Sequence, residues 1–380
     1  MKIIISPDSF KESLTAAQAA EAMAYAVELV APQVEKDIIP LADGGEGTVD
    51  ALVASTNGRY HNCQVINPLG ERINARYGIL GDNHTAIIEM AAASGLTLID
   101  VEQRNPMLAT TFGTGQMIKD AIAKGCDKII IGIGGSATND CGTGMAQALG
   151  VKFYDQNDNE ITGHMNGELL QAVKHIDVEE AQKYQGIDII AACDVDNPLL
   201  GEQGAVMIFS EQKGADAQQR IQLENNMRHI SKIIEQTTKS AIIDLKGAGA
   251  AGGLGAGLVA FLQAKLNPGI DLVLDACNFD QRIADARLVL TGEGRIDHQT
   301  KFGKTISGIL KRTRTKRIPV IAFAGSIDDR ADNLYAEGLL SMVSICSGPM
   351  NLEHAQRNAA HLLQKATERI LRVFFYRTSF

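Results

Sequence analysis

The sequence predicts an α/β fold: a flavodoxin-like parallel sheet domain built from both chain ends, with a second, mixed α/β domain inserted. Three observations predict it. At both ends of the 380-residue chain, short apolar strands alternate with helices, and a charged or glycine-rich loop follows each strand. Between residues 59 and 90 the pattern changes to the alternation of antiparallel strands. A chain of this length is also more typical of two domains than of one.

The N-terminal segment contains two strand–loop–helix units. The first strand is predicted at Lys2–Ser6, and its helix at Ala16–Leu29, with Thr15 as the N-cap and Pro32 beyond the end. The second strand, Asp37–Pro40, leads through a glycine-rich loop into another helix. Ligands of open α/β sheets bind at the carboxyl ends of the strands, so both loops are candidate binding loops.

The alternation returns near residue 284. Three strands and a final helix are predicted there: Arg287–Leu290, Pro319–Ala324, Leu340–Cys346 and Glu353–Val373. With the two N-terminal strands they form one parallel sheet, and right-handed crossovers favour the flavodoxin-like strand order. The expected domains are therefore residues 1–58 plus 284–380, and an inserted domain at 59–283, with the active site in the cleft between them.

The stretch Lys128–Gly150 combines a strand, a glycine turn and a helix. A buried strand at Ile129–Ile131 precedes glycines, then come polar residues suited to N-caps, and a helix is predicted at Met145–Leu149. The glycines and polar residues are Gly132, Gly134, Gly135, Ser136, Thr138, Asn139 and Asp140. This pattern would offer backbone N–H groups and a positive helix end to an anion. A tight turn without a ligand is the alternative that the stretch alone leaves open.

Composition excludes several function classes. The net charge is −9 without a basic block, which argues against a nucleic-acid partner. No apolar run reaches the length of a membrane span, and the N-terminus lacks a signal peptide, so we expect no membrane partner. The six cysteines are scattered without a CxxC pair, which argues against zinc or a disulfide framework and favours the reducing cytoplasm. The sequence is compatible with a homo-oligomer but does not reveal the oligomeric state.

No complete nucleotide motif is present. Gly303-Lys304-Thr305 imitates the end of a Walker A loop, but His298 occupies the place of its first glycine. Gly132–Ala137 loosely fits a dinucleotide fingerprint, without the acidic residue that a ribose contact needs. A dinucleotide-dependent oxidoreductase of small hydroxy acids is therefore one rival interpretation, and a non-catalytic sugar-acid sensor is another.

Acidic residues adjoin glycines at several strand ends. The loops contain Asp43 and Glu46 beside Gly44 and Gly45, Asp140 before a glycine, Glu293, Arg295 and Asp297 in one glycine-rich stretch, and Asp194 and Asp196 after the apolar run Ile187–Ala192. Phosphoryl transfer needs this mixture, because N–H groups hold phosphates, carboxylates hold Mg²⁺ and one carboxylate accepts a hydroxyl proton. For any single acid the alternative is a helix cap or a solvated turn, but the loops together favour phosphoryl transfer.

Seven short motifs follow one another along the chain: SPDSFKESL at 6–14, ADGGEGT at 42–48, GIGGSATNDCGTG at 132–144, DVDNPLLGEQGA at 194–205, QKGA at 212–215, GAGAAGGLGAG at 247–257 and TGEGRIDHQT at 291–300. Together and in this order they resemble the bacterial glycerate kinase family, type 1. The resemblance runs from residue 1 to about 370 and implies phosphorylation of D-glycerate by ATP with Mg²⁺, usually at the 2-hydroxyl. The 3-hydroxyl is the alternative. The aromatic tail, residues 373–380, departs from the family pattern.

On this interpretation, Asp194 is the expected base. Glu293, Asp297 and Asp196 are candidate ligands of Mg²⁺, because hard oxygen ligands suit this ion. Arg295 or Lys11 would bind the carboxylate of glycerate. The other expected substrate- or phosphate-binding residues are Asp8, Ser9, Asp43, Gly44, Gly45, Glu46, Gly134, Gly135, Ser136, Asn139, Asp140, Gly252 and Gly253. Which glycine loop holds ATP and which holds glycerate stays open.

Overall fold

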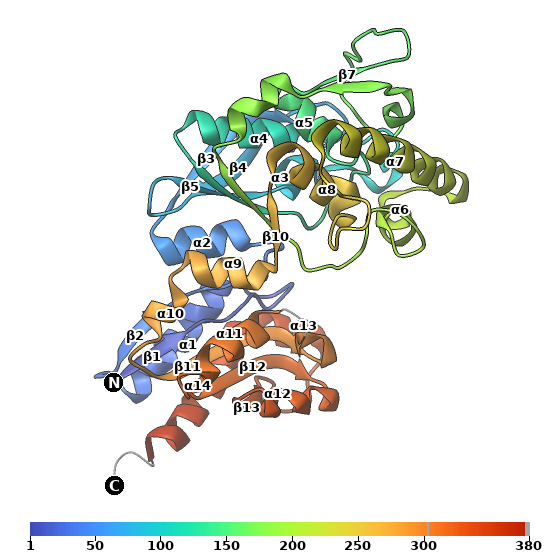
Figure 1. Cartoon of the computed structure of the whole chain (residues 1–380). Helices are drawn as coiled ribbons and strands as arrows, with labels where there is room; N and C mark the ends of the chain where they lie inside the picture. The colour runs from blue at the N-terminus through green and yellow to red at the C-terminus, as the bar shows by residue number, and fades with distance from the viewer. Residues whose placement is uncertain (302–303, 377–380) are drawn as a thin grey trace. The chain divides into compact units, whose positions relative to one another are not determined.

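The chain forms two compact units (Figure 1). The computed structural model describes residues 1–301 and 304–376, so Gly303 of the Walker-like stretch and the tail residues 377–380 lie outside the described residues. Unit 1 comprises Met1–Asp43, Asp50–Asn57 and Ile270–Phe380, and unit 2 comprises Gly44–Val49 and Gly58–Gly269.

Unit 1 contains a parallel sheet of five strands. The strands are β1 (Lys2–Ile5), β2 (Glu35–Ile38), β11 (Ala286–Ile296), β12 (Val320–Ile327) and β13 (Leu339–Ser344). Their order is β13-β12-β11-β1-β2, which places the first strand of the chain between the second and the third. The predicted flavodoxin-like order is confirmed.

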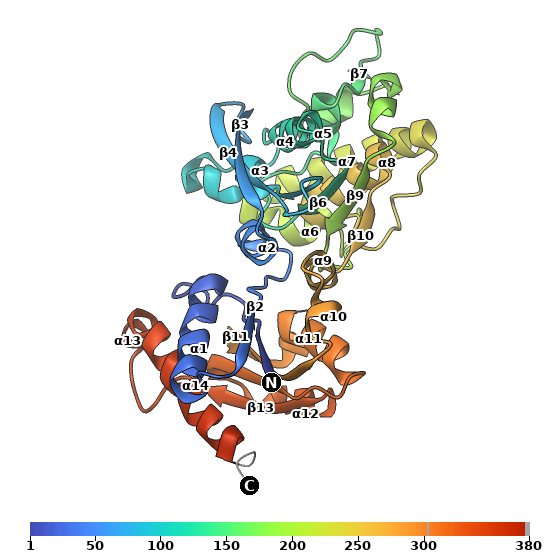
Figure 2. The ribbon, with the colours of Figure 1, turned by 90° about the vertical axis from the view of Figure 1, so that its left-hand side faces the viewer.

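Helices cover both faces of this sheet (Figure 2). On one face lie α1 (Ala16–Val30) and α14 (Ala359–Tyr376), and on the other α10 (Phe279–Arg282) and α11 (Thr305–Arg314). The remaining helices of unit 1 are part of α2 (Thr48–Thr56), α9 (Gly269–Ala276) from Ile270 onward, α12 (Asn333–Ala336) and α13 (Leu352–Arg357). Apolar residues of β1 and β11 pack against α1 and α14 in one buried core.

Helix ends in unit 1 show how local chemistry sets the boundaries. Thr15 caps α1 in a capping box with Gln18, as the sequence predicts. The single C-terminal helix predicted at 353–373 was wrong, because the chain leaves helical geometry at Asn358 and continues as α14. The sequence places the end of the inserted domain at residue 283, whereas the second compact unit of the structure ends at Gly269. Arg282 of α10 forms an ion pair with Asp37 of unit 1.

Strand β11 is longer than the sequence predicts. The stretch from Thr291 to Ile296 was expected to be a loop, but it continues the strand and pairs with β12 as far as Ile327. Gly292 permits this pairing, since a Cβ there would lie 2.4 Å from the carbonyl oxygen of Phe323. The glycines of this motif therefore serve close strand packing, and Glu293 is carried by a strand instead of a loop.

Unit 2 contains a six-stranded mixed sheet, in the order β10-β9-β6-β5-β4-β3, and a two-stranded antiparallel sheet. The strands of the large sheet are β3 (Arg59–Ile66), β4 (Arg72–Ile79), β5 (Thr85–Glu89), β6 (Lys128–Gly132), β9 (Asp188–Ala192) and β10 (Lys265–Asn267), and those of the small sheet are β7 (Lys152–Tyr154) and β8 (His175–Asp177). The antiparallel pairing predicted for residues 59–90 is confirmed, whereas β5, β6, β9 and β10 pair in parallel.

The helices of unit 2 include both long and very short ones. They are α3 (Ala91–Ser94), α4 (Phe112–Ala123), α5 (Thr143–Ala148), α6 (Ala205–Phe209), α7 (Ala217–Thr238) and α8 (Ala250–Leu262). Helix α8 contains a kink in which Ala251, Gly252 and Gly253 have left-handed backbone angles. The glycine cluster at 247–257 therefore contains the irregular first turn of α8.

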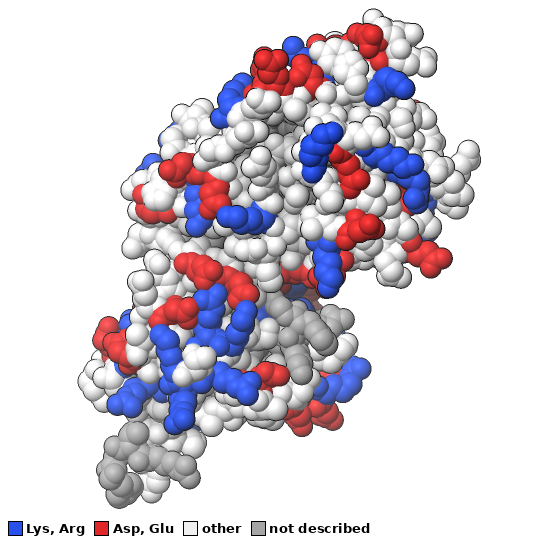
Figure 3. Space-filling model, viewed as in Figure 1, with Lys and Arg blue, Asp and Glu red and all other residues white. Residues whose placement is uncertain are grey.

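Charged side chains of both signs mix on the surface of unit 1 (Figure 3). Arg312, in the last turn of α11, lies within 3.4 Å of carboxylate oxygens of Asp271, Asp275 and Asp280. This network fastens α11 to α9 and α10. Of the helices in the described part of the chain, none combines the length and apolar character that crossing a membrane requires.

Candidate active site

A buried carboxylate, Glu293, and a partly buried one, Asp8, lie near each other in unit 1. Asp8 follows β1, and its backbone N–H donates to the carbonyl of Gly292 on β11, at 2.8 Å. Glu293 is the next residue of β11 and is 8% exposed. Thr300 donates its hydroxyl hydrogen to Oε1 of Glu293 at 2.7 Å, and Thr305, the first residue of α11, donates to Asp8. Two threonines of the segment after β11 therefore hold the two acids.

Burial controls the electrostatics of this pair. The pKa of Glu293 is raised to about 7, mainly by desolvation; the nearby negative charges of Asp8 and Asp43 add to the rise, and the hydrogen bond from Thr300 opposes it. Desolvation likewise raises the pKa of Asp8 to about 6, with Asp43 adding to the rise and Thr305 opposing it. Lys304 lowers the pKa of Glu293. Asp8, Asp43 and Glu293 thus form an acidic group in which charge is costly.

The acidic group suits a divalent cation. Mg²⁺ usually takes one or two protein carboxylates and fills its remaining positions with waters and substrate phosphates. Within the described residues no set of three or more His, Cys, Asp or Glu side chains is arranged to hold a metal by itself. The mutual repulsion of Asp8, Asp43 and Glu293 would be relieved by a positive charge, so their oxygen chemistry fits Mg²⁺ together with a phosphate.

The other predicted residues of unit 1 lie around the acidic group or on the surface. Ser9 donates its backbone N–H to Oδ1 of Asp8 at 2.6 Å. A Cβ at Gly294 would lie 3.2 Å from the backbone nitrogen of Lys11, so the loop after β1 touches β11. Arg295 is exposed, and its Nε lies 3.4 Å from Asp297 Oδ2. Arg295 and Lys11 are therefore cations on accessible segments beside Glu293.

The glycine loop after β6, residues 133–140, is the main feature of unit 2. Gly134 and Gly135 are exposed, and Gly135 has a φ of +72°, a conformation that suits glycine. Within the described ranges, no acceptor is recorded for the backbone N–H groups of Gly134, Gly135 and Ser136. The loop is anchored instead by the bond from Leu96 N to Gly135 O and from Ala137 N to Ser94 O. Three adjacent donors therefore remain for an anion.

The helix predicted at Met145–Leu149 is present and begins two residues earlier than expected. Helix α5 spans Thr143–Ala148, and its N-cap is Gly142 in a left-handed conformation. Asp140 is fully buried, and its carboxylate accepts hydrogen bonds from Thr111 N and Oγ1, Gly142 N and Gly144 N. Asp140 thus organises the turn between loop and helix, and the anion site rests on loop N–H groups without a helix end.

Lys213 lies beneath this loop, and sequence reasoning assigned it no role. It ends the short 3-10 helix η5 (Glu211–Lys213) and is 2% exposed. Its ammonium donates to Oγ of Ser136 at 2.8 Å and to the carbonyl of Thr138 at 2.6 Å. The QKGA motif contained it, but a surface lysine is the usual expectation for such a residue. Only its contacts in the folded chain make Lys213 a candidate functional residue.

Gly252 and Gly253 pack against the same loop from α8. A Cβ at Gly252 would lie 1.9 Å from the carbonyl oxygen of Thr138, and one at Gly253 would lie 2.9 Å from Cα of Cys141. Asn139 is fully buried, and its amide has no hydrogen-bond partner in the part of the chain that the structure describes. Gly252 and Gly253 therefore lie behind the loop and shape its backbone, while Asn139 is a buried residue of the loop itself.

Asp194 and Gly44 both contact Gly269 near the carboxyl end of β9. Asp194 is exposed, and its Oδ1 accepts a hydrogen bond from the backbone N–H of Gly269 at 2.8 Å. Gly44 has a φ of +97°, and a Cβ there would lie 2.7 Å from Cα of Gly269. The backbone bond holds the carboxylate of Asp194 in place at this edge.

The remaining predicted residues of unit 2 are more peripheral. Glu46 is exposed and Gly45 is partly buried, on the segment after Gly44. Asp196 is also exposed, with Oδ2 3.7 Å from Nζ of Lys246. Asp196 lies in unit 2, whereas Glu293 and Asp297, the other two predicted metal ligands, lie in unit 1.

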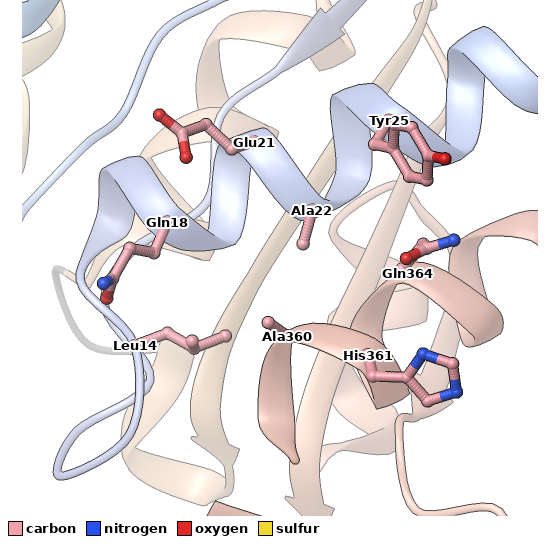
Figure 4. Close-up of a pocket in the computed structure, with 8 residues that line it drawn as sticks. All are labelled: Leu14, Gln18, Glu21, Ala22, Tyr25, Ala360, His361 and Gln364. Carbon is pink, nitrogen blue, oxygen red and sulfur yellow. The ribbon is translucent and has the colours of Figure 1, made fainter. Parts of the chain in front are cut away.

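A separate hollow lies between α1 and α14 of unit 1 (Figure 4). Leu14, Ala22 and Ala360 form its apolar floor, while Gln18 and His361 are polar lining residues. It contains none of the predicted site residues. Glu21 is the single carboxylate among its lining residues, so the hollow has no cluster of acids like the one around Asp8.

Three comparisons agree on the relatives of this chain. The glycerate kinase family matches residues 3–375. A protein of Bacillus subtilis strain 168 named glycerate kinase is 47% identical over 371 residues, which cover 97% of each chain. A protein of Escherichia coli K12 named glycerate 2-kinase is 44% identical over 371 residues, again 97% of each chain. A crystal structure from Salmonella typhimurium LT2, of a protein provisionally named glycerate kinase 2, matches all of both chains with a TM-score of 0.91 and 41% identity.

Proposed function

Since the chain belongs to the glycerate kinase family, we propose that it transfers a phosphoryl group from ATP to the 2-hydroxyl of D-glycerate. The observation that carries the proposal is the full-length match to this family in a chain that also has both parts phosphoryl transfer needs. These are the acidic group of Asp8, Asp43 and Glu293, and the loop donors of Gly134, Gly135 and Ser136. The relative named glycerate 2-kinase supports the 2-hydroxyl as acceptor.

The acidic group is proposed to hold Mg²⁺. Bound there, the ion would offset the negative charge of the ATP phosphates, as in other phosphoryl transfers. Glu293 and Asp8 are proposed as its carboxylate ligands, with Asp297 close by on the same segment. Thr300 and Thr305 orient the two carboxylates through their hydroxyl hydrogens. Each threonine therefore supports a ligand position and is not itself needed as a ligand.

Asp194 remains the proposed base. Its carboxylate is held by the N–H of Gly269, which fixes a base better than a mobile side chain could. It would accept the proton of the 2-hydroxyl as the oxygen attacks phosphorus. Arg295 and Lys11 are proposed to bind the carboxylate of glycerate, since both are accessible cations on segments that adjoin the acidic group.

The loop after β6 is proposed to hold a phosphoryl group. Backbone N–H groups of Gly134, Gly135 and Ser136 supply donors that need no side-chain reorganisation when the anion arrives. The exposure of the two glycines lets the ligand approach the backbone closely. The proposal does not depend on whether this phosphoryl group belongs to the nucleotide or to the phosphorylated product.

A coupled assay tests the function. Purified protein is given ATP, Mg²⁺ and, in turn, D-glycerate, glycerol, tartronate and small sugar acids, and ADP release is followed. Phosphorus NMR of the product then distinguishes 2-phosphoglycerate from 3-phosphoglycerate. The proposal is supported if ADP is released only with D-glycerate, or faster with D-glycerate than with any other acceptor. Binding of a nicotinamide cofactor without any ATP turnover would replace it with the oxidoreductase interpretation.

A further inference from the structure

The contacts of Lys213 define a hydrogen-bond direction in the glycine loop. Below its pKa of about 7 Lys213 is an ammonium, which can only donate, so Oγ of Ser136, at 2.8 Å, is then the acceptor. The hydroxyl hydrogen of Ser136 is then directed to a different acceptor. Across residues 1–301 and 304–376 no acceptor is recorded for this hydrogen. Ser136 is 8% exposed, so the hydroxyl is partly shielded from water yet can meet a ligand at the loop surface.

The unassigned donors of the loop are adjacent in sequence. The backbone N–H groups of Gly134, Gly135 and Ser136 lack recorded acceptors in the described ranges, and the Ser136 hydroxyl adds a fourth donor. A tetrahedral phosphoryl group offers several acceptor oxygens and a negative charge, which matches adjacent donors with a cation behind them. Neutral ligands would gain little from the buried charge.

Lys213 also holds the backbone of the loop. Its second bond, 2.6 Å to the carbonyl of Thr138, ties the loop to η5. Gly252 leaves room for that carbonyl, because any Cβ there would collide with it. The buried carboxylate of Asp140 is close enough to raise the pKa of Lys213, but it already accepts hydrogen bonds from four donors. The ammonium therefore remains a source of positive potential for the loop.

We propose that Lys213 is a positioning residue for the phosphoryl group in the loop, acting through Ser136 without touching the ligand. It orients the Ser136 hydroxyl outward and polarises it, so that this hydroxyl becomes a charge-assisted donor. The inference deepens the proposed kinase function and rests on it for the identity of the ligand, a nucleotide phosphate or phosphoglycerate. On this proposal, the selectivity of the loop for anions comes from the side chain of Lys213, which lies beneath the loop.

The test compares Lys213→Met, Ser136→Ala and the double variant with wild type. Calorimetry at pH 6, where Lys213 is protonated, measures the dissociation constants of a non-hydrolysable ATP analogue, of 2-phosphoglycerate and of inorganic phosphate. For whichever ligand the loop takes, each single variant should weaken binding roughly tenfold to a hundredfold, as expected for a charge-assisted bond. The double variant should weaken it no more than the larger single change, because both variants break one relay. The KM of the substrate that does not bind at the loop should stay within about twofold of wild type.

Controls separate this inference from folding and from the proposed function. Lys265→Met removes an exposed lysine of the same unit, which pairs with Asp188, and should leave all dissociation constants unchanged. If Lys213→Met melts well below wild type, Lys213→Gln and Ser136→Ala carry the test. Additive effects, or binding within about twofold of wild type in Lys213→Met, would overturn the inference. Wild type that binds phosphoryl ligands but does not turn over glycerate would contradict the proposed function alone, while wild type that binds none of them contradicts this inference.

Discussion

Thr305 donates its hydroxyl hydrogen to the carboxylate of Asp8, although the two residues are 297 positions apart in the sequence. Asp8 belongs to the first loop of the chain and Thr305 to the start of α11, and the parallel pairing of β1 with β11 brings them together. The bond fixes an acid that is otherwise costly to bury and links the two ends of the chain at the acidic group.

Asp194→Asn tests the proposed base. The amide can still accept the hydrogen bond from Gly269 N, so the local structure should persist and the melting temperature should stay near that of wild type. An amide cannot take a proton from the hydroxyl, so kcat should fall on the order of a hundredfold or more. Steady-state kinetics beside a thermal melt measures both. Turnover within about threefold of wild type, with a normal melt, would remove Asp194 from the mechanism and leave Glu293 or Asp43 as the next base to test.

Activity should require a divalent cation and should depend on Glu293. Removal of the cation with excess chelator should abolish turnover, because no complete Walker A loop supplies the charge that phosphoryl transfer needs. Glu293→Gln keeps an acceptor for Thr300 and removes one charge, so the Mg²⁺ concentration for half-maximal activity should rise about tenfold or more. Titration of activity with Mg²⁺ gives this value. Full activity of wild type in excess chelator would contradict the assignment.

Gly252→Ala should damage the glycine loop. The residue has a φ of +65°, and the added Cβ would lie 1.9 Å from the carbonyl oxygen of Thr138, which also accepts from Lys213. We expect the free energy of unfolding to fall by more than about 1 kcal/mol, together with weaker phosphoryl binding. Gly201→Ala is the matched control, since Gly201 has a φ of +91° and nothing within 4 Å of an added Cβ. Equal losses in the two variants, by denaturant titration, would mean that backbone strain alone explains the effect.

Lys213 should make stability depend on pH. Burial lowers the pKa of Lys213 from 10.5 to about 7, with Asp140 opposing the shift. Between these values the unfolded chain binds the proton and the folded chain does not, so this stabilising contribution is fully present above about 10.5 and is lost as the pH falls through about 7. Wild type should therefore gain melting temperature relative to Lys213→Met from pH 7 to pH 9.

Thermal melts at the two pH values check this prediction. Lys265→Met provides the comparison, because its exposed ammonium should leave the difference from wild type nearly constant. If the difference between wild type and Lys213→Met is equally constant across the range, Lys213 does not titrate there.

Much of the architecture followed from the sequence alone. The periodic apolar strands at Lys2–Ser6 and Pro319–Ala324, and the capped helix after Thr15, could be identified because burial and capping are local signals. The strand order followed from the handedness of crossovers, which limits how parallel strands can be connected. Because the acidic and glycine-rich loops follow strands, the sequence also indicated that candidate binding residues lie at the carboxyl ends of the strands.

Only the tertiary structure decided what each residue of those loops contacts. The glycines within 291–296 were interpreted as loop residues, but they allow β11 to continue as a longer strand. In a sequence, a glycine needed for close strand packing cannot be distinguished from a glycine of a flexible loop. The carboxylate of Asp140 accepts a hydrogen bond from the backbone of its own turn, and Lys213 donates a hydrogen bond to Ser136, 77 positions away in the sequence. The sequence by itself determined the elements and their order, because these depend on neighbouring residues. The partners of Asp8, Asp140 and Lys213 were decided by packing, because hydrogen bonds between distant segments depend on distances that exist only in the folded chain.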